Sequence, residues 1–265
     1  MTTDDVLEIR GLQKSFGRVQ ALREATMTLP RGQVTAIIGD NGAGKSTLVR
    51  CIVGVHAPDS GEVLLEGRPV NFANPEQARS AGIETVFQDL ALVEDLTVAQ
   101  NLFLGREVTR GFGPFHFLDR GRMRREAHTM VSKLAINVPQ VNARVRRLSG
   151  GQRQAVSLAR AAGFSSKLVV LDEPTAALGV QETARVEELI TSLRDSGVTI
   201  LLISHNFKQV MQIADHVQVM RAGRTVARRR VDETDGQELV ALVTGATAED
   251  GRDAASADDQ KERTR

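Results

Sequence analysis

The sequence of 265 residues has one cysteine, no tryptophan and no tyrosine. A single cysteine, Cys51, excludes an internal disulfide framework and a cysteine-rich zinc site. Phenylalanine occurs only nine times, so aromatic rings are scarce throughout the chain. That scarcity argues against a surface that stacks nucleic-acid bases and against a pocket that grips sugars on ring faces.

Long apolar runs and an excess of one charge are also missing. The longest apolar stretches, residues 168–171 and 199–203, are far shorter than the ~18 residues of a membrane-spanning helix. Thirty-four basic residues against 33 acidic ones leave a net charge of +1, which gives no overall field toward nucleic acid. Residues 1–5 lack the features of a secretion signal. We therefore expect a globular cytoplasmic chain without a nucleic-acid partner.

A strand, a glycine-rich loop and a helix follow one another between residues 33 and 58. Residues 33–38 are a β-branched apolar run, and apolar residues recur at helical spacing from Leu48 until Pro58. The loop between them consists of Gly39, Asp40, Asn41, Gly42, Ala43, Gly44, Lys45, Ser46 and Thr47. This order of elements is typical of a phosphate-binding loop, or P-loop.

Each residue type in this loop has a physical role in binding phosphate. Glycines permit positive φ angles and let backbone N–H groups converge on an anion. The helix that begins near Gly44 adds unpaired N–H groups and the positive end of its dipole. We expect Lys45 to bridge the β- and γ-phosphates and the Ser46 hydroxyl to bind Mg²⁺.

Two acids follow a second buried strand, residues 167–171. Asp172 and Glu173 are costly at the end of an apolar strand unless they meet a cation or hydrogen-bond donors. We expect Asp172 to hold Mg²⁺ through water, and Glu173 to orient or deprotonate an attacking water. An acidic first turn before Pro174 is the alternative interpretation.

Two further segments belong to the same pattern. A third apolar strand, residues 198–204, ends at His205. We expect His205 to lie at the γ-phosphate, because it follows a buried strand of the same series. The other histidines are interpreted as structural. Residues 148–152 precede a helix with small apolar side chains on one side. Ser149 and the two glycines after it form a second anion-binding helix start; taken alone, these residues would favour a plain N-cap.

Taken in order, these motifs resemble the nucleotide-binding domain of the ATP-binding cassette (ABC) family across about residues 6–240. The resemblance rests on the P-loop, Gln88 after Val86-Phe87, the signature segment 148–152, Asp172-Glu173 and His205. It implies an α/β fold: a P-loop NTPase core of mixed sheet and flanking helices, an antiparallel β subdomain, and a helical signature subdomain at about 88–163. The ATPase domain would span 1–243. Residues 244–265, almost free of large apolar side chains, are expected to be disordered.

The resemblance also implies roles for individual residues. ATP and Mg²⁺ are the implied cofactors, with Phe16 stacking on adenine and Gln88 sensing the metal beside Ser46 and Asp172. Catalytic roles fall to Lys45, Gln88, Glu173 and His205. A head-to-tail dimer is implied, in which Ser149, Gly150, Gly151 and Gln152 of one copy meet the nucleotide of the other. One departure is Gly179, because the family usually has aspartate there.

Residues 87–107 are similar to the corresponding segment of bacterial monosaccharide importers, particularly in the ending Leu-Gly-Arg-Glu. This similarity implies an importer ATPase, bound peripherally at the cytoplasmic side of the bacterial inner membrane, with a second nucleotide-binding subunit, membrane permease subunits and a solute-binding protein. Alternatives are an ABC ATPase of another transporter, such as an exporter, and a soluble ABC ATPase acting on DNA or ribosomes. No heptad run or second P-loop supports the soluble alternative.

Two weaker features concern surfaces. Apolar residues after position 89 are expected to line a groove for a permease helix, or else to be core: Leu90, Leu92, Val93, Leu96, Val98, Leu102 and Phe103. An arginine cluster follows residues 217–219 in a predicted hairpin: Arg221, Arg224, Arg228, Arg229 and Arg230. We interpret the cluster as a solvated strand edge, with lipid headgroup contact as the alternative.

Overall fold

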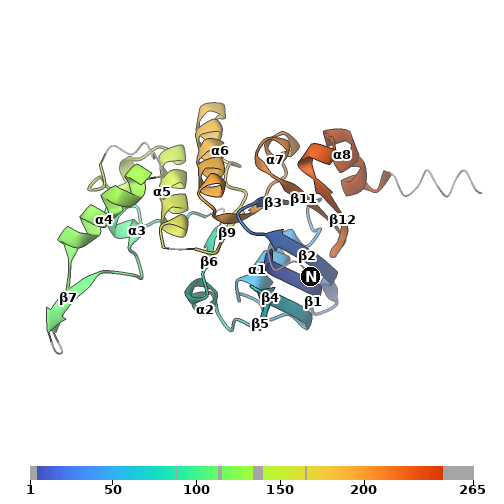
Figure 1. Ribbon diagram of the computed structural model, residues 1–265, viewed down its shortest axis with the longest axis horizontal. Coiled ribbons are helices and arrows are strands. Elements are labelled where there is room, and N and C mark those ends of the chain that lie inside the picture. Colours follow the sequence, from blue (N-terminus) through green and yellow to red (C-terminus); the bar gives the residue numbers. More distant parts are fainter. Residues whose placement is uncertain (1–4, 88, 113–114, 134–139, 165, 247–265) are drawn as a thin grey trace, which may run out of the picture.

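The computed structural model describes residues 5–87, 89–112, 115–133, 140–164 and 166–246. Ten strands form one mixed sheet in the order β5-β4-β1-β2-β12-β11-β3-β10-β9-β6, and helices cover both of its faces (Figure 1). The predicted α/β class, with a mixed sheet and an antiparallel part, is confirmed.

The parallel strands of the sheet lie at the centre of the molecule (Figure 1). They are β3 (Val34–Ile38), β6 (Ile83–Val86), β9 (Leu168–Asp172), β10 (Thr199–Ile203) and β11 (His216–Arg221). Alternate residues of one strand enter different cores: Ala36 and Ile38 of β3 pack on one face, and Ile37 packs on the other. Because β3, β9 and β10 are buried on both faces, they need nearly continuous apolar runs, and these three strands are the ones that the sequence predicts.

The antiparallel part contains β1 (Asp5–Phe16), β2 (Val19–Pro30), β4 (Ser60–Leu65), β5 (Arg68–Val70) and β12 (Arg224–Arg230). A turn follows Phe16, with Gly17 at φ 57°. Strand β1 is long, because a register shift between Ile9 and Leu12 lets its pairing with β2 continue to Phe16.

The arginine-rich strand β12 does not lie at the edge of the sheet, which corrects the expected strand edge. It pairs with β11 along its length and meets β2 through Arg224 and Glu24. Successive residues of β12 alternate between exposed and half-buried. Four of the five arginines in the cluster therefore belong to β12, which lies between β2 and β11 in the sheet. The fifth, Arg221, is the last residue of β11.

The helices lie on the two faces of this sheet. On the side of the antiparallel strands are α1 (Lys45–Ile52) and α2 (Pro75–Ser80). On the other side stand α5 (Gly150–Ala162), α6 (Val180–Asp195), α7 (Phe207–Ile213) and α8 (Gly236–Thr244) (Figure 1). Within the described ranges, no helix combines the length and the apolar character needed to cross a membrane.

The region that carries the signature segment is mainly helical. It contains α3 (Val98–Leu102), α4 (Arg120–Lys133), α5 and a 3₁₀ turn (Val145–Arg147). A hairpin that the sequence did not predict, β7 (Thr109–Phe112) and β8 (Phe115–Leu118), projects away from the molecule beside α4 (Figure 1). Leu102 and Met123 nevertheless share one core cluster with Ala36 of the central sheet. Three predicted limits stay predictions: about 88–163 for the helical subdomain, 1–243 for the ATPase domain and 244–265 for the tail.

Candidate functional site

The P-loop connects the buried strand β3 to helix α1 through left-handed glycines. Gly39, Gly42 and Gly44 have φ angles of 152°, 83° and 102°. A Cβ on Gly39 would lie 2.1 Å from the carbonyl oxygen of Met220, and one on Gly44 would lie 2.7 Å from that of Ala21. Only glycine fits these two positions, because both the backbone angle and the neighbouring carbonyl exclude a side chain.

Lys45 folds back over the loop from which it emerges. Its Nζ donates to the carbonyl oxygen of Gly39 at 2.6 Å and to that of Asp40 at 3.0 Å. Partial burial lowers the pKa of Lys45, while the negative charges of Glu173, Asp40 and Asp172 act in the opposite direction. Gly44 precedes the first turn of α1 and has no side chain to cap it, so an anion can approach those N–H groups.

The two acids lie where β9 ends. Burial is the main cause that raises the pKa of Asp172, the Glu173 charge adds to it, and Arg50 and Lys45 oppose it. Glu173 has a φ of 52°, an uncommon left-handed conformation for a residue other than glycine. Its backbone N–H donates to the carbonyl oxygen of Ile203 at 3.0 Å. This bond ties the end of β9 to the end of β10.

His205 contacts Glu173 directly, since its Nδ1 lies 2.7 Å from a carboxylate oxygen. A polar network beside this pair joins the segment after β9 to the segment after β10. The Ser204 hydroxyl donates to Gln209 at 2.9 Å, and the Gln209 amide donates to the Thr175 hydroxyl at 2.9 Å. Both Ser204 and Gln209 are buried, so the network fixes the backbone on either side of the predicted catalytic residues.

These elements surround one open cavity of about 850 Å³, here called the P-loop cavity. Seven of the predicted P-loop residues line it: Asn41, Gly42, Ala43, Gly44, Lys45, Ser46 and Thr47. Asp172, Glu173 and His205 line it as well, so the structure brings these three to the loop. Gly39 and Asp40 are not among its lining residues and contact Lys45 through their carbonyl groups.

Sequence reasoning missed several lining residues. Val19, Gln20 and Ala21 enter the cavity from the start of β2, and Arg50 and Val55 come from α1 and the turn after it. None of these carries a motif, so only their place in the fold reveals them. Phe87 and Asp89 also line the cavity. The predicted Gln88 between them lies outside the described residues.

Phe16 is not among the residues that line the P-loop cavity. Its ring packs edge-to-face on His56, with centroids 5.0 Å apart, and the Lys14 ammonium lies 5.6 Å from its centroid. Phe16 as a whole remains 44% exposed. The structure therefore places the predicted adenine platform at the end of β1, beside the turn that leads to Val19.

The signature segment begins helix α5 with a capping box. The Ser149 hydroxyl accepts from the backbone N–H of Gln152 at 3.3 Å, and the Gln152 side chain accepts from the backbone N–H of Ser149 at 3.1 Å. None of the four predicted signature residues lines the P-loop cavity of the same chain. The backbone N–H of Gly151 donates instead to Glu182 of α6, at 3.3 Å. Sequence reasoning missed Glu182, although its spacing after Gly179 is that of a capping box.

The predicted permease groove divides between core and surface. Val98, Leu102 and Phe103 are fully buried core residues, whereas Val93 is 43% exposed. A cavity of about 370 Å³ on the helical region involves other residues, none of them in the predicted set. Its lining consists of Thr97, Ala99, Gln100, Arg120, Met123, Arg124 and Asn142.

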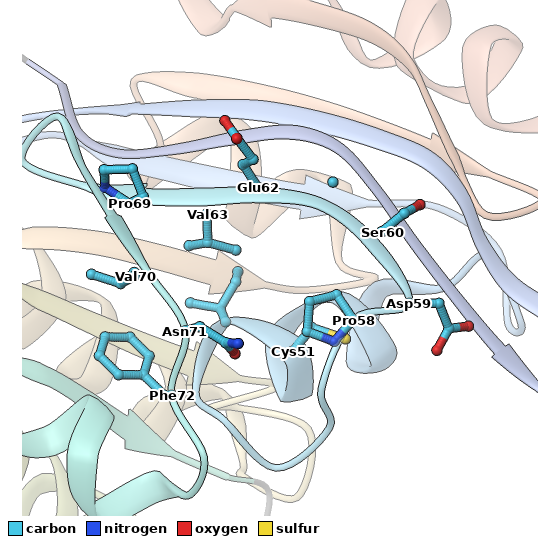
Figure 2. Close-up of a pocket in the computed structure, with 12 residues that line it drawn as sticks. Cys51, Pro58, Asp59, Ser60, Glu62, Val63, Pro69, Val70, Asn71 and Phe72 are labelled. Carbon is cyan, nitrogen blue, oxygen red and sulfur yellow. The ribbon is translucent and has the colours of Figure 1, made fainter.

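A separate cavity of about 350 Å³ lies between α1 and the antiparallel strands (Figure 2). Cys51 and Pro58 stand on one side of it, and Val63, Val70 and Phe72 gather on the other (Figure 2). Burial raises the pKa of the Cys51 thiol to about 11. Within the described ranges, no group of three or more His, Cys, Asp or Glu side chains is placed to hold a metal ion, here or elsewhere.

Comparison with known proteins gives consistent results. A family model described as "ABC transporter" matches residues 22–176. The chain is 47% identical to a fructose import ATP-binding protein of Rhizobium meliloti, over 93% of this chain and 96% of the relative. It is 45% identical to a xylose/arabinose import ATP-binding protein of Sulfolobus acidocaldarius, over 91% and 94%. A ribose import ATP-binding protein of Chromobacterium violaceum is 39% identical, and 46% of its length is covered.

Solved structures agree in fold. The ADP conformation of an ATP-binding cassette of an ABC transporter superposes with a TM-score of 0.77 at 27% identity, covering 91% of this chain and 95% of the other. A nucleotide-free cassette from an ABC transporter gives a TM-score of 0.75 at 27% identity, with coverage of 91% and 95%.

Proposed function

This chain belongs to the ATP-binding cassette family of ABC transporters, and from that premise we propose that it powers the uptake of a monosaccharide through a separate membrane permease. As a member of this family it is an ATPase. The relatives named as sugar import ATP-binding proteins match nearly the whole of both chains, and this observation carries the choice of import and of sugar.

We assign the phosphates of ATP to the P-loop cavity. The N–H groups at the start of α1 and the ammonium of Lys45 provide a positive surface there. Lys45 would exchange its bonds to the Gly39 and Asp40 carbonyls for the β- and γ-phosphate oxygens. The lowered pKa of Lys45 shows that burial disfavours its charge, and a phosphate partner would compensate this.

Glu173 is the proposed general base. Its carboxylate would accept a proton from the attacking water as the oxygen bonds to the γ-phosphorus and the bond to ADP breaks. The Ile203 carbonyl bond and the His205 contact hold Glu173 in place. His205, 70% exposed at its side chain, faces the open side of the cavity and would contact the γ-phosphate.

The donor set also fits Mg²⁺, which takes one or two carboxylates and completes its shell with water and substrate phosphates. The Ser46 hydroxyl and the half-buried Asp172 line the same cavity, and we assign the metal to them, together with Gln88. When bound, Mg²⁺ would neutralise charge on the phosphate oxygens.

We propose that the signature segment serves a second copy of the chain. Ser149 and Gly151 do not line the P-loop cavity of their own subunit, which fits a role toward the nucleotide of a partner. Closure of two copies around ATP, and release after hydrolysis, would move docked permease helices together and apart. A solute-binding protein would deliver the sugar, and the ATPase would sit peripherally at the cytoplasmic face of the bacterial inner membrane, without a nucleic-acid partner.

The test is affinity purification of the tagged chain from detergent-solubilised membranes of its own source, followed by mass spectrometry. Co-purification of a multi-spanning permease, and ATPase activity of that complex stimulated by a sugar with its binding protein, is the expected result. An exporter would need no binding protein. Recovery of ribosomes or DNA from the soluble fraction, without a membrane protein, would overturn the transport assignment and leave the ATPase chemistry intact.

A further inference from the structure

We propose that Glu182 is a positioning residue of the signature segment: within one subunit it occupies the γ-phosphate-binding groups, and it has to release them before two subunits close around ATP. This inference rests on the proposed function, because it requires the signature segment to meet nucleotide on a second copy. It assigns a role to a residue outside the P-loop cavity.

The Glu182 carboxylate lies between the starts of two helices. One oxygen accepts from the backbone N–H of Gly151 in α5 at 3.3 Å, and the other accepts from the backbone N–H of Gly179 at the start of α6 at 3.5 Å. The neighbouring Ser149 hydroxyl also acts on this carboxylate and helps to lower its pKa. The two helices approach closely here, since a Cβ on Gly151 would lie 3.0 Å from the Glu182 Cβ.

The electrostatics of this position favour a negative charge. Each helix start presents the positive end of its dipole and unpaired N–H groups. Hydrogen bonds from Gly151, then Ser149, then Gly179 lower the pKa of Glu182. The carboxylate is therefore ionised at neutral pH and fills the anion position at the signature segment.

The same donors are the ones assigned to the γ-phosphate of the partner. The Gly151 N–H cannot bond fully to both the Glu182 carboxylate and a phosphate oxygen. Two anions at one helix start also repel each other. ATP-driven closure therefore has to displace Glu182, and the strength of its hydrogen bonds sets the ATP concentration at which closure occurs.

Gly179 makes this arrangement possible. It is the N-cap residue of α6 and has no side chain, so the cap is completed by Glu182 three residues later. An unoccupied space surrounds Gly179, with no atom within 4 Å of a Cβ built on it. The carboxylate can thus release Gly151 while it keeps its hydrogen bond from the Gly179 N–H.

The experiment compares Glu182→Gln with its parent in a Glu173→Gln background, which keeps bound ATP intact. Sedimentation with Mg-ATP gives the ATP concentration at which half of the chain is dimeric. Removing the charge should lower this midpoint by about two- to fivefold, the fold-change that corresponds to the ~0.3–1 kcal/mol of a charge at a helix start. Affinity of the monomer for ATP should not change, because Glu182 does not line the P-loop cavity.

A matched control is Glu238→Gln in α8. Glu238 also lies in a first helical turn, accepts from the Thr234 hydroxyl and from Arg229 at 2.7 Å each, and has a lowered pKa. The Glu238→Gln substitution should leave the ATP concentration for half-dimerisation unchanged. Glu182→Asp provides a second variant: it keeps the first-turn charge but shortens the reach to Gly151, so the midpoint should move in the same direction by less.

The outcomes separate the two proposals. A Glu182→Gln midpoint equal to its parent's, or higher, would make Glu182 a cap of α6 only and overturn this inference while leaving the proposed function standing. Failure of the parent itself to dimerise with ATP, alone or with the permease, would overturn both. In wild-type background, a fall in KM for ATP without a fall in kcat supports the inference, because loss of a structural cap would lower kcat.

Discussion

The Glu173 carboxylate and the His205 imidazole are 2.7 Å apart, although they follow different strands and are 32 positions apart in the sequence. The adjacent Ile203 carbonyl accepts the Glu173 N–H, so backbone and side chain fix the same residue. The side chain of Glu173 is only 20% exposed, and that of His205 is 70% exposed. The proposed base is therefore the inner member of the pair.

Glu173→Gln should bind ATP but hydrolyse it about 10²- to 10⁴-fold more slowly, because the amide cannot accept a proton from water. Single-turnover hydrolysis with Mg-ATP measures the change. Glu188→Gln, on an exposed part of α6, is the control and should keep the parent rate. A Glu173→Gln chain that turns over ATP at the parent rate would remove Glu173 from the mechanism.

Lys45→Ala should weaken nucleotide binding itself. The ammonium is proposed to make charge-assisted hydrogen bonds to phosphate, each contributing ~1.5–3 kcal/mol, so ATP affinity should fall on the order of tenfold or more. Isothermal titration calorimetry with ATP measures it. Lys208→Ala, an exposed lysine of α7, should bind ATP like the parent. Unchanged affinity in Lys45→Ala contradicts the phosphate-binding assignment.

Gly39→Ala should destabilise the fold. The added Cβ would lie 2.1 Å from the Met220 carbonyl oxygen at a φ of 152°, so β11 or the P-loop has to move. We expect a loss of at least about 2 kcal/mol in the free energy of unfolding. Chemical denaturation measures it. Gly236→Ala in α8, where a Cβ meets no atom within 4 Å, should be neutral or slightly stabilising. Equal effects of the two substitutions would show that the contact with Met220 imposes no constraint.

Cys51 should react slowly in the folded protein. The residue is only 5% exposed. Burial raises the pKa of its thiol from 9.0 to about 11, so roughly one thiol in 10³ is ionised at pH 8. Because the folded pKa is the higher one, the stability gained by burying the neutral thiol is complete below pH 9 and is lost as the pH rises toward 11.

Alkylation by iodoacetamide at pH 8 measures this reactivity, with the guanidinium-unfolded chain as reference. The folded chain should be modified orders of magnitude more slowly. Equal rates would mean that the environment of Cys51 is open. Binding of ATP should slow the reaction further if it stabilises α1, in which Cys51 lies.

Much of the fold and of the phosphate site was predictable because the information is local. The strand, loop and helix around Lys45 are contiguous in the chain. Strands buried on both faces, such as β9 and β10, require apolar runs that stand out in the sequence. The order of the motifs then identified the family, and the match over residues 22–176 confirms it.

Features that depend on distant contacts were not predictable. That β12 also lies beside β2 depends on a bridge between Arg224 and Glu24, which are 200 positions apart in the chain. The exposed Phe16 ring, set on His56, depends on how two separate segments meet. The β7–β8 hairpin has no strong alternating apolar pattern to announce it.

The sequence by itself determined the chemistry, because a P-loop, two acids and a histidine after apolar strands are legible as patterns of residue types. Only the tertiary structure decided which of these groups meet. It placed Glu173 against His205 and Glu182 against Gly151. Contacts of this kind arise when strand ends align at one edge of a sheet and helix starts converge, and their energies depend on distances that no local sequence pattern encodes.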